Sequence, residues 1–125
     1  MASPNTAFEA ITKRMAYYTN AAISKYYGVQ WNSDGLLELA DGTKPFAGIV
    51  EYGADAAGQL ATTVMGIYPG IASTADMPKG AYVSFKNGKL VTVTSGTALG
   101  ITVSAGTKVD DLVGVALFDA PFTIK

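Results

Sequence analysis

The fold class follows from the stretch Lys79-Gly-Ala-Tyr-Val-Ser-Phe-Lys-Asn-Gly-Lys-Leu-Val-Thr-Val-Thr94 of this 125-residue chain. Two short runs of mostly β-branched and aromatic residues, 81–85 and 90–94, flank its Lys-Asn-Gly-Lys centre. Asn-Gly between such runs predicts a β-hairpin, because a type I′ turn needs positive φ at both central residues. Side chains alternate along a strand, so Val83 and Phe85 are expected on one face and Tyr82 on the other.

The rest of the chain extends this pattern and predicts a mainly β domain. Short apolar or alternating runs lie at 29–31, 36–40, 46–52, 59–67, 71–74, 99–103, 112–118 and 122–124. Turn residues such as Asp41-Gly42, Pro69-Gly70 and Ser95-Gly96 separate them. Many short strands in one small domain favour an antiparallel β-barrel or sandwich. Periodicity alone does not distinguish the barrel from the sandwich.

Residues 6–28 are expected to form one N-terminal α-helix. Thr6 and Glu9 fit a capping box, and Gly28 is a suitable C-terminal stop. Apolar residues between them recur at spacings of three and four, as on one face of a helix: Phe8, Ile11, Met15, Tyr18, Ala22 and Tyr26. The predicted fold class is therefore mainly β with one helix (α+β). A helical arm, 1–28, precedes a barrel or sandwich domain, 29–125, in a single compact unit.

The predicted helix is apolar around more than half of its girth, which leaves two interpretations open. It packs across the sheet of its own chain with its tyrosines partly exposed, or those tyrosines meet another chain. Aromatic residues are enriched in the cores of protein interfaces. The second interpretation predicts an interface made of Phe8, Ile11, Met15, Tyr17, Tyr18, Tyr26, Tyr27 and Trp31.

Composition argues against several classes of function. The chain has no cysteine and no histidine, so we expect no disulfide framework, no metal site and no cofactor. Nine basic and ten acidic residues give a net charge of −1, unlike the basic surface of a nucleic-acid-binding protein. No apolar run approaches the roughly 20 residues that cross a bilayer, and the N-terminus lacks a signal-peptide pattern. We expect a soluble protein that stays in the compartment of its synthesis.

Candidate catalytic groups are sparse, so we expect no enzymatic activity. Asp110 and Asp111 are adjacent rather than paired across a site, and the serines have no histidine to activate them. No glycine-rich segment matches a phosphate-binding loop. The aromatic residues of the predicted interface could stack on a sugar, but their helical spacing favours packing.

A series of strand and turn motifs from Phe46 to the C-terminus resembles the small capsid decoration (cement) proteins of tailed bacteriophages. It covers about two-thirds of the chain. The motifs are Ala47-Gly-Ile-Val50, the strand Gln59–Met65 with Gly66-Ile67, Ile71-Ala-Ser-Thr74, Lys79-Gly-Ala-Tyr-Val83, Asn87-Gly-Lys-Leu-Val91 and Leu112-Val-Gly-Val-Ala-Leu-Phe-Asp-Ala120. The predicted helix lies outside this resemblance, since the family has a short extended arm at its N-terminus.

The resemblance implies a structural protein of the virion. Such a protein assembles in the cytoplasm of the bacterial host and binds the outer capsid surface as a homotrimer near three-fold positions. Its partner is the major capsid protein, whose subunit contacts it stabilises against the pressure of packaged DNA. The alternative is a head or tail appendage domain that binds a receptor or glycan through Trp31 and the tyrosines.

Overall fold

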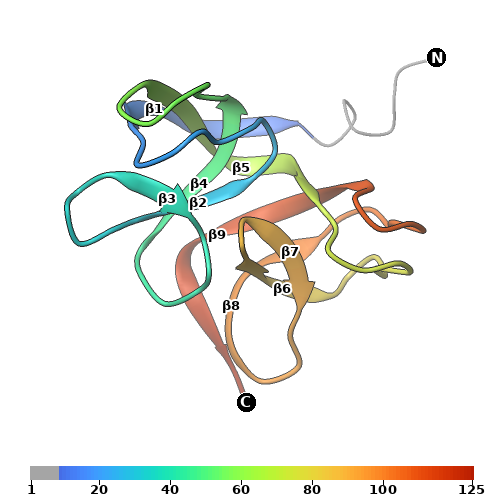
Figure 1. Ribbon diagram of the computed structural model, residues 1–125. Coiled ribbons are helices and arrows are strands. Elements are labelled where there is room, and N and C mark those ends of the chain that lie inside the picture. Colours follow the sequence, from blue (N-terminus) through green and yellow to red (C-terminus); the bar gives the residue numbers. More distant parts are fainter. Residues whose placement is uncertain (1–8) are drawn as a thin grey trace.

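The computed structural model describes residues 9–125, and these form nine β-strands joined by turns (Figure 1). No helix occurs in this part of the chain. The mainly β prediction is therefore confirmed. The strands are β1 (Ala10–Tyr18), β2 (Gly28–Trp31), β3 (Leu37–Leu39), β4 (Phe46–Tyr52), β5 (Leu60–Ile71), β6 (Tyr82–Lys86), β7 (Lys89–Thr92), β8 (Gly96–Thr102) and β9 (Leu112–Ile124).

The strands build one antiparallel sheet in the order β3-β2-β4-β5-β9-β8-β6-β7, with β1 added on β5. Val64 of β5 is paired with both β1 and β4, and Ile67 with both β1 and β9. A residue with two partners has one on each edge of its strand. β4 and β9 therefore follow one another along one edge of β5, while β1 occupies the opposite edge.

The sheet curls at both ends into a half-barrel (Figure 1). At one end the residues after β1 meet β3, where the amide of Asn20 donates to the Leu37 carbonyl at 3.0 Å. At the other end the residues after β5 meet β7, where the amide of Ser73 donates to the Leu90 carbonyl at 3.0 Å. Each curled half encloses its own group of apolar side chains.

Two hydrophobic cores lie on opposite faces of β4 and β5. In β4, Ile49 belongs to one core and its neighbour Val50 to the other, as strand alternation requires. One core contains Ile23, Val29, Leu37, Ala47, Val50, Ala54 and Ala61. The larger core contains Ala40, Ile49, Val64, Tyr68, Ala72, Met77, Val83, Phe85, Leu90, Leu99, Val113, Val115 and Leu117. β4 and β5 thus form the shared wall of the molecule.

The predicted hairpin is confirmed and fastens the two halves together. Its turn residues Asn87 and Gly88 have φ of 51° and 78°, as a type I′ turn requires. Phe85 is buried in the larger core. The amide of Gly88 donates to the Ala40 carbonyl at 2.9 Å, and the Gly88 carbonyl accepts from the Gly28 amide at 2.8 Å.

The predicted N-terminal helix is wrong over the described residues, which hold strand β1 instead. Thr6 and Phe8 lie outside the described part of the chain. Residues four apart, such as Ile11 and Met15, satisfy a period of two as well as a helical period, and the segment is rich in β-branched and aromatic residues. Pairing with β5 also satisfies backbone groups of both strands. The expected apolar stripe is divided, because the pairing with β5 shifts register between Ile11 and Lys13, so that Ile11 packs on the larger core and Met15 on the smaller one.

Candidate functional site

A groove opens where β4 and β9 diverge from the shared edge of β5. β4 is paired with β5 as far as Val64, and the pairing with β9 starts at Ile67, so Met65 has a partner in neither strand. Gly48 and Gly66 have φ of 118° and 107°, a backbone conformation that side chains other than glycine rarely adopt. A Cβ atom at Gly48 would lie 2.6 Å from the Val64 carbonyl oxygen, and one at Gly66 would overlap the Ala10 carbonyl oxygen, so each position next to the groove requires glycine.

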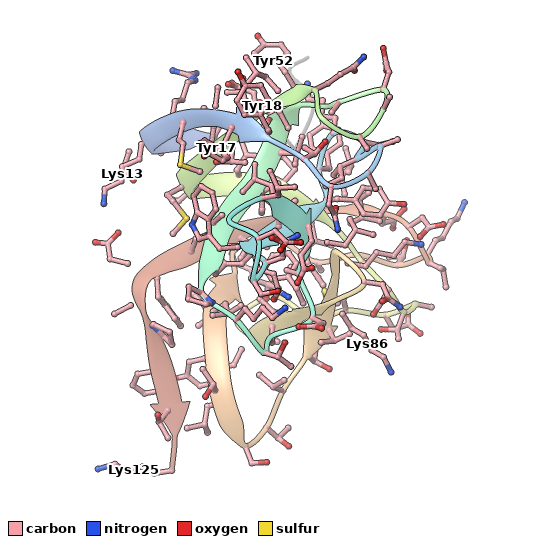
Figure 2. All side chains as sticks on the ribbon, turned by 60° about the vertical axis from the view of Figure 1, so that its left-hand side comes forward. Lys13, Tyr17, Tyr18, Tyr52, Lys86 and Lys125 are labelled. Atoms are coloured by element: carbon pink, nitrogen blue, oxygen red, sulfur yellow. The ribbon has the colours of Figure 1, made fainter. Side chains whose placement is uncertain are left out.

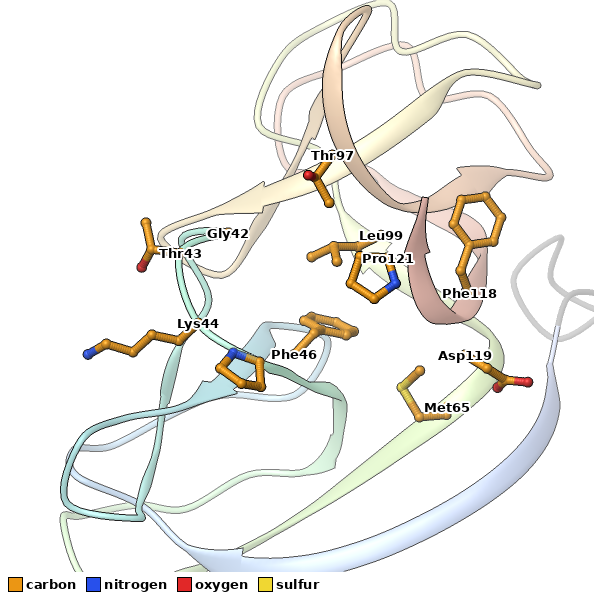
Figure 3. A pocket seen from close by; sticks show the side chains of 11 residues that line it. Gly42, Thr43, Lys44, Phe46, Met65, Thr97, Leu99, Phe118, Asp119 and Pro121 are labelled. Atoms are coloured by element: carbon orange, nitrogen blue, oxygen red, sulfur yellow. The ribbon is translucent and has the colours of Figure 1, made fainter. Parts of the chain in front are cut away.

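The groove has a volume of about 530 Å³ and a mainly apolar lining. One wall is the loop 42–45 and the other is β9 around residues 118–121; the floor includes Phe46, Met65 and Leu99 (Figure 3). A second hollow of about 220 Å³ shares Phe46 and Met65 with it and extends to Met15 and Trp31. The two hollows adjoin at these shared residues, and we refer to both together as the groove. The volume of the larger one lies within the size range of binding sites.

The charged groups along the groove are mostly cationic. Arg14 is held by Glu51, with Nε 2.9 Å from Oε1 and the second nitrogen 3.1 Å from Oε2. That hydrogen bond, with the charge of Glu51, raises the pKa of Arg14. Lys44 Nζ lies 3.6 Å from Oε2 of Glu38, which does not line the groove. Lys13 and Asp119 also line it, and neither forms an ion pair within residues 9–125.

A second surface, which we name the aromatic patch, consists of Tyr18, Tyr52 and Leu60. Tyr18 is paired with Leu60, and Tyr52 with Thr62 two residues further along β5, so the three side chains share one face of β1, β5 and β4. Their exposed fractions are 50% for Tyr18, 66% for Tyr52 and 53% for Leu60. Figure 2 shows Tyr18 and Tyr52 close together at one end of the molecule, with Lys125 at the other end.

The structure brings three of the eight predicted interface residues together. The Tyr17 ring lies edge-on to Trp31 at 5.2 Å and to Tyr18 at 5.6 Å between ring centres. Tyr26 packs on the larger core with its ring centre 5.8 Å from that of Tyr68.

The other predicted interface residues lie apart from this cluster. Tyr27 packs on the smaller core. Ile11 and Met15 are half-buried against separate cores, and Phe8 lies outside the described residues. Tyr52 and Leu60 were missed, although they flank the small-residue turn between β4 and β5, where exposure is common.

Two further observations concern residues 9–125. No group of three or more acidic side chains there is placed to hold a metal ion. This part of the chain also contains no helix long and apolar enough to cross a membrane.

Comparison with solved structures finds the same fold in a phage protein. One match is the crystal structure of the head fiber gp8.5 N base of bacteriophage phi29, with a TM-score of 0.68 and 15% sequence identity. The alignment covers 88% of this chain and 97% of that one. This chain has the fold of a head fiber base. No family model matches the chain, and no curated protein matches it.

Proposed function

We propose that this chain is a structural protein of the outer surface of a tailed-phage head, and that it binds other proteins rather than catalysing a reaction. One observation carries the proposal: the fold similarity to a phage head fiber base extends over nearly all of both chains. The sequence resemblance to capsid decoration proteins supports the same location. The protein would assemble onto the head in the bacterial cytoplasm.

In the more specific form of the proposal, the chain is a decoration or cement protein. It binds the major capsid protein as a homotrimer and stabilises contacts between neighbouring capsid subunits. Burial of apolar surface contributes roughly 25 cal/mol per Å² before the costs of association are subtracted. Repetition over many equivalent sites multiplies a modest gain per site.

A second candidate is the base of a head appendage that carries or contacts a receptor-binding part. The fold similarity to a fiber base favours it directly. The cluster of Tyr17, Tyr18 and Trp31 offers faces on which a sugar can stack.

The test uses heads of a tailed phage assembled without this chain. The purified protein is added at increasing concentration, and head-bound protein is measured after sedimentation. We expect saturable binding at a fixed number of copies per head. A rise in the temperature at which the filled heads rupture identifies cement, whereas binding without that rise, with glycan binding lost in Trp31→Ala, identifies the appendage base. Absence of binding to these heads contradicts both.

A further inference from the structure

The groove and the aromatic patch are both mainly apolar, and both belong to the same chain. The patch presents large apolar side chains that are half or more exposed, of which Tyr52 and Leu60 are the most exposed. The groove presents an apolar floor that includes Phe46 and Met65. The methionine side chain is flexible and adapts to an inserted aromatic or leucine group.

The charges of the two surfaces are also complementary. Asp55 lies in the turn that joins β4 to β5, is exposed, and forms no ion pair within residues 9–125. The groove has Lys44 at one end and Lys13 at the other, with Asp119 as its acidic lining residue. An acidic, apolar surface therefore faces a mostly basic, apolar groove when two copies meet head to tail.

We propose that a second copy of this chain inserts its aromatic patch into the groove of the first. Leu60 and Tyr52 of one copy cover Met65 and Phe46 of the other, and Asp55 approaches Lys44. The inference rests on the homo-oligomer in the proposed function, and it names the contact that builds that oligomer.

A symmetric pairing of like surfaces is unfavourable on charge. A patch-to-patch dimer would bring two copies of Asp55 together, and like charges repel. The contact is therefore between different surfaces, and such contacts close into rings when the rotation between copies permits, as in a trimer.

Two substitutions at exposed positions test the contact. Lys44→Glu also replaces the half-exposed ion pair of Lys44 with Glu38 by two like charges, so the folding of each variant is checked. Leu60→Lys places a charge in the patch, and Lys44→Glu places an acidic group opposite Asp55. We expect each to raise the dissociation constant of the oligomer at least tenfold in sedimentation equilibrium, with the circular dichroism spectrum unchanged. Val109→Lys is the matched control, because Val109 is 56% exposed outside both surfaces. It should associate like the unmodified chain.

Mixing the two variants gives the decisive readout. Copies with Leu60→Lys keep an intact groove, and copies with Lys44→Glu keep an intact patch. At a concentration where each variant alone is monomeric, an equimolar mixture should form heterodimers and nothing larger in native mass spectrometry. The double variant Asp55→Lys with Lys44→Glu should regain association, since the charge pair is reversed.

Three outcomes overturn the inference: a monomeric unmodified chain at all concentrations, unaltered association of both variants, or a mixture that stays monomeric. The proposed function is tested separately. If the unmodified chain is monomeric but binds phage heads, only the proposed contact is refuted. If it associates as described but does not bind heads, the proposed function is refuted and the contact stands.

Discussion

Replacing Gly88 by alanine should lower the free energy of unfolding by about 2–5 kcal/mol. Gly88 has φ of 78°, and an L-residue in this region costs about 1–2 kcal/mol. A Cβ atom there would also lie 2.7 Å from side-chain carbons of both Leu39 and Tyr27. Overpacking of this kind adds about 1–3 kcal/mol. The sum is large because the hairpin tip is docked between the two halves of the molecule.

Gly96→Ala is the matched control for this experiment. Gly96 has φ of 79°, but nothing lies within 4 Å of the position of its Cβ, so only the backbone cost of about 1–2 kcal/mol applies. Effects of alanine on the unfolded chain are common to both variants and cancel in the difference. Urea denaturation with a constant m-value should show Gly88→Ala less stable than the control by about 1–3 kcal/mol. Equal losses would refute the docking of the hairpin tip.

Three further predictions concern the cores and the titrating groups. Gly28→Ala should cost about 1–3 kcal/mol in urea denaturation, because its Cβ would overlap the buried ring of Phe85. The backbone amides of Lys108 and Thr107 donate to the Asp111 carboxylate and hold its pKa below the ordinary 3.8. The stabilising contribution of Asp111 is therefore present above that pH and lost as the pH falls. Asp111→Asn should reduce the dependence of Tm on pH below about 5. Burial raises the pKa of Tyr68, one of seven tyrosines. In a spectrophotometric titration of the native protein, fewer than seven tyrosines should therefore ionise near pH 10. The free energy of unfolding should fall as the pH rises further, because Tyr68 ionises more readily in the unfolded chain.

Local turn chemistry made much of the sheet predictable. Asn87-Gly88 demands a type I′ turn and is found in one. The run Phe46–Tyr52 is strand β4 from end to end. Both segments are bounded by residues with strong turn preferences, so their secondary structure could be predicted without knowledge of the strands that they pair with.

Tertiary pairing decided the parts that the sequence pattern did not predict. Residues 10–18 form a strand because they pair with the free edge of β5, and nothing in their local sequence predicts that pairing. Pro69 and Gly70 were expected to end a strand, yet β5 continues to Ile71. Beyond Ile67, β1 no longer pairs with β5, and proline is tolerated where its missing N–H faces no ladder partner.

In the candidate site, too, some features could be predicted from the sequence and others depend on tertiary pairing. Tyr17, Tyr18 and Trp31 were predicted as surface aromatics and do form a cluster. The groove could not be predicted, because its floor residue Met65 is exposed by the separation of β4 and β9, which are more than 50 residues apart in the chain.

The most direct test of the central claim is cryo-electron microscopy of intact heads with and without this chain. The account predicts extra density that fits the nine-stranded fold at regularly repeated positions on the outer surface of heads containing the chain. Heads whose outer surface is identical in the two reconstructions, despite the presence of the protein in the infected cell, would contradict it.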